Sequence, residues 1–77
     1  MSRVSFVDAI KIARQLGFNG DLKEFWMGMN VEMEHFKVLG GSRLKVGRVV
    51  LNHLDERKDY YSFGLKRKFF TRAEVGL

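Results

Sequence analysis

The sequence contains no cysteine and no proline among its 77 residues. Without cysteine, the chain cannot form disulfides, thiolate metal sites or thiol nucleophiles. No apolar run approaches the roughly 20 residues that a membrane-spanning helix needs, and no apolar signal region follows the N-terminus. These absences predict a protein without a membrane segment, located in the cytoplasm or in an assembly made there.

The chain is short for a protein that lacks disulfides, because a domain of this size buries only about 60% of the surface of its unfolded form. Regular helix packing, a histidine/carboxylate metal site or self-association would have to stabilise it. Charge is distributed unevenly. Residues 1–36 carry four Lys/Arg against five Asp/Glu, net −1, and residues 37–77 carry ten against four, net +6. The second half is therefore the expected contact for an acidic partner.

Apolar residues recur with helical spacing in four segments. These segments lie near residues 5–16, 22–37, 44–57 and 60–70. Their expected N-caps are Ser5, Asp21, Ser42 and Asp59. Glu24 follows Asp21 by three residues, which is the spacing of a capping box. The run "VGRVVL" is also compatible with a strand, but its spacing favours a helix. The pattern predicts an all-α fold, a single domain that forms a compact bundle of three to four short helices.

The segment near 22–37 is apolar on two sides, with Met27 and Val31 opposite the main stripe. A helix that is apolar nearly all round is buried. It must therefore be the central helix, or it must meet a second copy of the chain. Gly28 lowers helix stability by about 1 kcal/mol relative to alanine, which predicts the close approach of another backbone on the second side. The candidate partner-binding residues are Trp26, Met27, Val31 and Phe70.

Two pairs of glutamate and histidine are spaced for metal binding. Each pair is separated by three residues, so its members share a helix face. The four candidate ligands, for two iron or manganese ions or for zinc, are Glu32, His35, His53 and Glu56. In the alternative interpretation, His53 is a core histidine bonded to a carboxylate or carbonyl. Glu32 and His35 then form a hydrogen-bonded pair that supports the packing.

We favour this structural interpretation of the glutamate and histidine pairs and expect no cofactor. We also expect no catalytic residue, because Ser5, Ser42 and Ser62 lack a nucleophile-elbow context. The stretch "LGGS" lacks the lysine and the flanking strand of a phosphate-binding loop.

The C-terminal end combines positive charge with aromatic rings. The candidate contacts for nucleic acid or an acidic partner are Lys66, Arg67, Lys68 and Arg72, interleaved with Phe69 and Phe70. Phosphate neutralisation and base stacking use such a mixture. An acidic protein surface would satisfy the same residues, and solvated helix residues beside two core phenylalanines would give the same pattern.

The stretches "EFWMGMNVEMEH" and "GRVVLNHLDERKDYY" resemble a small helical family of unknown function found in bacteria and phages. The resemblance covers about residues 12–65, and Lys58 stands where the family often has proline. It implies no activity, ligand or catalytic residue, but its phage association implies a virion or accessory component, in the host cytoplasm or in a virion. The matching positions also define an expected structural polar cluster of Glu32, Glu34, His35, His53, Asp59, Tyr60 and Tyr61.

Three functions are compatible with these features. The leading hypothesis is a non-enzymatic interaction or structural module that docks on another protein or on a second copy of itself. The first alternative is a histidine/carboxylate metal-binding protein. The second is an accessory protein that binds nucleic acid through the basic C-terminal half.

Overall fold

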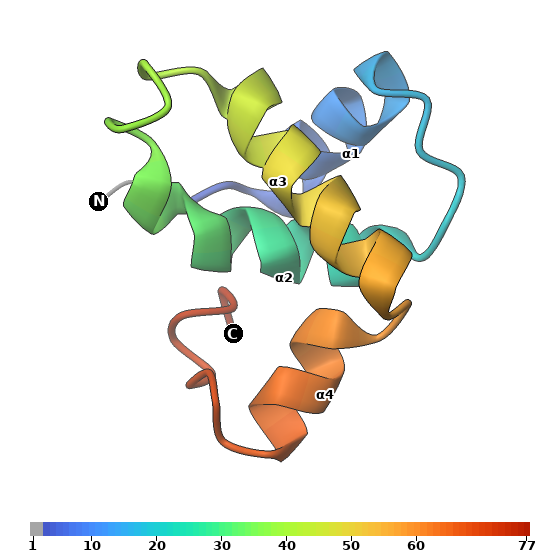
Figure 1. Cartoon of the computed structure of the whole chain (residues 1–77), viewed down its shortest axis with the longest axis vertical. Coiled ribbons are helices and arrows are strands. Elements are labelled where there is room, and N and C mark those ends of the chain that lie inside the picture. Colours follow the sequence, from blue (N-terminus) through green and yellow to red (C-terminus); the bar gives the residue numbers. More distant parts are fainter. Residues whose placement is uncertain (1–2) are drawn as a thin grey trace.

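The computed structural model describes residues 3–77, and these residues form helices and turns without any β-strand. The elements are α1 (Phe6–Gln15), α2 (Leu22–Glu32), the 3-10 helix η1 (Met33–His35), α3 (Arg43–Glu56) and α4 (Tyr60–Lys66). In Figure 1, α2 crosses the middle of the molecule, with α1 and α3 on one side of it and α4 on the other. This arrangement confirms the all-α bundle. No helix in the described part of the chain is long and apolar enough to cross a membrane.

The first three α-helices begin with side-chain caps at Ser5, Asp21 and Ser42, as the sequence predicts. In each case a side-chain oxygen accepts a hydrogen bond from a backbone N–H two or three residues further on. The fourth helix differs, because Asp59 makes no side-chain capping bond. Its carboxylate pairs instead with the guanidinium of Arg57. The cap of α4 must therefore come from elsewhere.

Helix α2 is buried on both of its apolar sides. Phe25 and Met29 are fully buried, and Met27 and Val31 are 3% and 8% exposed. The helix touches α1, α3 and α4, so it is the central helix of the two options that the sequence left open. The expectation that Met27 and Val31 contact a partner is wrong for the folded chain, because other parts of the same chain cover them.

Both ends of the described chain pack against α2. The backbone N–H of Val4 donates to Asn30 Oδ1 at 2.9 Å, and its carbonyl accepts from Trp26 Nε1 at 2.9 Å and from Asn30 Nδ2 at 3.2 Å. Val75, in the C-terminal segment, is fully buried. A Cβ atom at Gly76 would lie 2.7 Å from Asn30 Nδ2. Trp26, a candidate partner contact, is half-buried, and its only side-chain donor, the indole N–H, bonds inside the fold.

Helix α4 ends at Lys66, whereas the sequence pattern extends to about residue 70. The reason is a tight reversal of the backbone in which Lys68 adopts a positive φ of 65°. The backbone N–H groups of Phe69 and Phe70 donate to the carbonyl of Gly64 at 2.7 and 3.3 Å. The Phe70 ring then lies directly on Gly64, where any side chain would overlap it. Such a reversal usually has glycine at the left-handed position, so no sequence signal marks it here.

Candidate functional site

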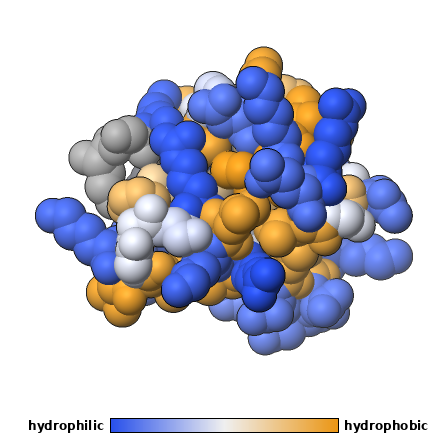
Figure 2. Space-filling view, turned by 90° about the horizontal axis from the view of Figure 1, so that it is seen from above, coloured by the Kyte–Doolittle hydropathy of each residue, from blue (hydrophilic) through white to orange (hydrophobic). Residues whose placement is uncertain are grey.

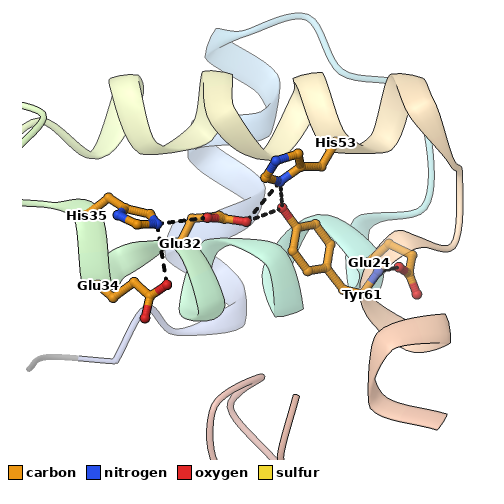
Figure 3. A network of polar contacts seen from close by, with 6 residues as sticks. All are labelled: Glu24, Glu32, Glu34, His35, His53 and Tyr61. Atoms are coloured by element: carbon orange, nitrogen blue, oxygen red, sulfur yellow. Dashed lines mark hydrogen bonds and ion pairs between the residues drawn. The ribbon is translucent and has the colours of Figure 1, made fainter. Parts of the chain in front are cut away.

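Tyr61, the second residue of α4, is fully buried against α2, where Figure 3 shows it between Glu24 and Glu32. Its backbone N–H donates to Glu24 Oε1 at 3.0 Å, and its hydroxyl donates to Glu32 Oε2 at 2.9 Å. Between the two carboxylates lies Gly28, where a Cβ atom would overlap the Tyr61 ring and lie 2.6 Å from Val50 Cγ1. Residues four apart share a helix face. The Glu-x3-Gly-x3-Glu spacing therefore forms a binding site on α2 for this one tyrosine.

Glu24 supplies the missing cap of α4. Its Oε1 accepts hydrogen bonds from the backbone N–H groups of Tyr61 and Ser62 at 3.0 and 3.1 Å, and its Oε2 lies 3.2 Å from Ser62 N. A carboxylate at this position also interacts favourably with the positive end of the helix dipole. The capping-box role expected for Glu24 is wrong, because Asp21 caps α2 alone and the buried Glu24 side chain reaches α4.

Glu32, Tyr61 and His53 form a three-way contact that joins α2, α3 and α4 (Figure 3). His53 Nδ1 lies 2.9 Å from Glu32 Oε2 and 3.0 Å from the Tyr61 hydroxyl. The His53 ring stacks on Tyr60, with ring centroids 4.6 Å apart and planes inclined by 9°. His53 therefore sits in the carboxylate-bonded arrangement that the structural interpretation of the sequence favoured. Such a bond compensates for burying the Glu32 charge, which is 5% exposed.

The expected polar cluster assembles around Glu32 with one exception. His35 Nε2 lies 3.7 Å from Glu32 Oε1 and 3.3 Å from Glu34 Oε1, at the solvent-exposed edge of the cluster. Asp59 does not join it, because its carboxylate pairs with Arg57 at the corner between α3 and α4. The members brought together are Glu32, Glu34, His35, His53, Tyr60 and Tyr61.

Three of the four candidate metal ligands, Glu32, His35 and His53, lie in this cluster, but the fourth does not join them. Glu56 is exposed at the end of α3, where it lines a cavity with Tyr60 and Phe63. Within residues 3–77, no group of three or more histidine, cysteine, aspartate or glutamate side chains is arranged to hold a metal ion.

The buried hydroxyl of Tyr61 predicts a specific loss of stability at alkaline pH. Burial and the nearby charge of Glu32 raise the pKa of Tyr61 far above its ordinary value. In the unfolded chain the group ionises near pH 10, so above about pH 10 only the folded chain keeps the proton. The contribution of the Tyr61 hydroxyl to the free energy of unfolding is therefore fully present below about pH 10. Above about pH 10, this contribution falls by about 1.4 kcal/mol per pH unit.

Urea unfolding between about pH 8 and pH 11 measures this loss. The comparison is between the unmodified chain and Tyr61→Phe, with Tyr60→Phe as the control that keeps the buried hydroxyl. We expect the stability difference between the unmodified chain and Tyr61→Phe to shrink above about pH 10. A difference that stays constant across this range would contradict the assignment.

The second cluster is a surface that we call the basic aromatic face. It consists of Arg57, Phe63, Lys66, Arg67, Lys68 and Phe69. The guanidinium of Arg57 lies 3.6 Å from the centroid of the Phe63 ring, and that of Arg67 lies 5.6 Å from it. Phe69 is 67% exposed. Arg57 also lowers the pKa of Asp59 through their hydrogen bond.

The other predicted contact residues of the C-terminal end lie apart from this face or beneath it. Arg72 is exposed in the segment that follows the reversal. Phe70 is half-buried and packs on Tyr61, with ring centroids 5.8 Å apart. It is therefore mainly a core residue. Arg57 and Phe63 were not predicted, although the spacing of Phe63 and Arg67 by four residues places the two on one side of α4.

Exposed hydrophobic side chains elsewhere are spread over several elements. They include Phe6, Val7, Val38, Leu44 and Leu77. Figure 2 shows the molecule from above, where hydrophobic patches lie between hydrophilic side chains. Scattered apolar residues of this kind are normal on protein surfaces.

Comparison with protein families gives a match to a family described as "Protein of unknown function (DUF5661)", over residues 4–65. The match spans α1 to α3 and most of α4, and it includes the Glu-x3-Gly-x3-Glu stripe and Tyr61. It stops before Lys66, so most of the cations of the basic aromatic face lie outside it. Comparisons with curated proteins and with solved structures give no match. Because the matched region covers most of its length, the chain belongs to the DUF5661 family.

Proposed function

We propose that this protein is a non-enzymatic interaction module that binds an anionic partner through the basic aromatic face. The main supporting observation is the position of Phe69, which is 67% exposed directly after three consecutive cationic residues, Lys66 to Lys68. All three cations are exposed. Exposed cations attract an anionic partner over several ångströms, and an exposed ring adds contact area once the partner has bound.

The buried polar side chains support a module without enzymatic activity, because they bond to other parts of the chain. Glu24 caps α4, and Glu32 bonds to Tyr61 and His53. No buried side-chain nitrogen or oxygen in the described residues lacks a hydrogen-bond partner. These groups therefore join three helices together, and none of them needs a substrate to satisfy it.

The partner is proposed to be a different molecule rather than a second copy. The two-sided apolar pattern of α2, which left a second copy open, is accounted for by α1, α3, α4 and the chain ends. A chain with a net charge of +5 also repels its own copies. The resemblance to a family found in phages suggests the setting, a phage-encoded virion or accessory component in the host cytoplasm or in a virion.

Binding to inorganic polyphosphate tests the proposed function, because this polymer offers negative charge without bases or side chains. The double variant Lys66→Glu/Lys68→Glu removes two cations from the face. The control Lys11→Glu/Lys45→Glu changes two exposed lysines on α1 and α3 by the same charge. We expect polyphosphate binding to weaken much more in the first variant than in the control. The slope of the logarithm of the binding constant against the logarithm of the salt concentration should be smaller in magnitude by about two in the first variant than in the control.

Equal loss of polyphosphate binding in the two variants would overturn the proposal, because it would show that net charge alone decides binding. Thermal unfolding followed by circular dichroism shows whether each variant is folded. Both pairs of lysines are exposed, so we expect midpoints close to that of the unmodified chain.

A further inference from the structure

Two cavities adjoin each other where α3 meets α4. The larger has a volume of about 490 Å³ and is lined by Glu56, Arg57, Tyr60, Phe63, Phe69 and Phe70. The smaller has a volume of about 440 Å³ and is lined by Arg57, Asp59, Ser62, Phe63, Lys66 and Arg67. Both include Arg57 and Phe63, so one ligand can extend from the first cavity into the second.

The walls of the larger cavity are mostly aromatic and are held in place from behind. Phe69 meets Phe63 edge-on, with ring centroids 6.3 Å apart. Tyr60 is fixed by its stacking on His53, and Phe70 by its contact with Tyr61. Rings that are supported on one side and open on the other suit a planar ligand, which stacks on them with little loss of side-chain entropy.

The smaller cavity carries the positive charge. Lys66 and Arg67 are exposed, and the charge of Asp59 is offset by its pairing with Arg57. Aromatic cavities also bind quaternary ammonium groups, but a cationic ligand here would be repelled by the neighbouring lysine and arginine side chains. The combination therefore selects a ligand with a planar ring at one end and an anionic group at the other.

We propose that these two cavities bind single-stranded nucleic acid, with an unpaired base in the larger cavity and its phosphate on Lys66 and Arg67. The inference rests on the proposed function, since it names the anionic partner of the same face. A duplex keeps its bases stacked and paired, so it cannot place one among Tyr60, Phe63 and Phe69 without unpairing it. An acidic polypeptide would satisfy the cations, but its carboxylates would leave the aromatic cavity unfilled.

Glu56 favours guanine among the bases. Among residues 3–77, it is the only acidic residue that lines the larger cavity. An ionised carboxylate only accepts hydrogen bonds, and guanine presents two adjacent donors, N1–H and the N2 amino group. Thymine presents one N–H between two carbonyl oxygens, which a carboxylate repels. A strand with isolated guanines is therefore expected to bind more tightly than one made of thymine alone.

Fluorescence anisotropy with labelled strands of about 12 nucleotides tests this site. The probes are oligothymidine, the same strand with isolated guanines, and a duplex of equal length, with polyglutamate as an acidic polypeptide. We expect Phe69→Ala to weaken single-strand binding by roughly 5- to 100-fold, and Phe69→Trp to retain it. Val38→Ala, at a residue that is 86% exposed, is the matched control and should have no effect. Glu56→Gln should abolish the preference for guanine without weakening binding to oligothymidine.

Three results would overturn the inference. They are tighter binding of the duplex than of the single strand, a Phe69→Ala effect no larger than that of Val38→Ala, and binding of polyglutamate as tight as that of the oligonucleotides. Polyphosphate binding separates this inference from the proposed function. If polyphosphate still binds through Lys66 and Lys68 while the base-dependent effects are absent, the face is an anion-binding surface for another class of partner. Circular dichroism confirms that each variant is folded.

Discussion

Replacing Tyr61 with alanine is expected to lower the free energy of unfolding by about 3–5 kcal/mol, which is the usual range for removing a buried aromatic side chain. A protein of this size typically has a total of about 5–15 kcal/mol. The ring fills the space above Gly28 and packs on Phe70, and the hydroxyl bonds to Glu32. Its removal leaves both a cavity and a buried carboxylate with one partner fewer.

Urea unfolding followed by Trp26 fluorescence and by circular dichroism measures this loss. Tyr61→Phe keeps the ring and isolates the hydroxyl, for which we expect about 1–3 kcal/mol because the Glu32 carboxylate stays buried. Tyr60→Phe is the matched control on the neighbouring residue, because it leaves the bonds of the Tyr61 hydroxyl to Glu32 and His53 in place, and its effect should be within about 0.5 kcal/mol. If Tyr61→Ala unfolds at the same urea concentration as the unmodified chain, the central role of this tyrosine is refuted.

Much of the fold follows from local patterns that a sequence displays directly. Helical spacing of apolar residues identified four helices, and Ser5, Asp21 and Ser42 marked three of their starts. The cost of Gly28 inside a helix predicted a close approach on the second side of α2. That approach exists, but the Tyr61 ring and Val50 make it, rather than another backbone. A glycine shows that space is needed and does not show what fills it.

The candidate site depended on contacts that local patterns do not specify. The three-residue spacing of Glu24 from Asp21 is that of a capping box, but the spacing does not show where the Glu24 side chain points. In the structure, this side chain accepts hydrogen bonds from Tyr61 and Ser62 on another helix. The spacing of Glu24, Gly28 and Glu32 was visible in the sequence. The role of these three residues could be inferred only from the packing of α4 along that stripe. This packing depends on the corner between α3 and α4.

The C-terminal segment was the hardest part to predict, because it is short and has no periodicity. The reversal after α4 has Lys68 at the left-handed position, so the usual glycine signal is absent. Val75 lies between Glu74 and Gly76, yet it is fully buried. The next residue, Gly76, lies against Asn30 and Trp26 of α2, which are distant in the sequence, so no local pattern marks this packing.

A chain that ends at Leu65, where the family match ends, is therefore expected to be much less stable than the full chain. It would lose Phe70, which packs on Gly64 and Tyr61, and Val75, which is fully buried. Burying a phenylalanine or a valine contributes about 1.5–3 kcal/mol each, so we expect a loss of about 3–6 kcal/mol. Removing Leu77 alone is the control, because this residue is 40% exposed.

The test is urea unfolding of the shortened chain, together with Val75→Ala in the full chain. The substitution separates the packing contribution from the loss of the cations at Lys66 to Lys68, because it leaves those residues in place. If both chains unfold at the same midpoint as the full sequence, the segment does not stabilise the fold. If both are destabilised, the segment outside the family match completes the core. The same segment then also holds Phe69 in position, because Phe70 is packed against Gly64 and Tyr61 directly beside it. Stability and the basic aromatic face would therefore depend on the same contact.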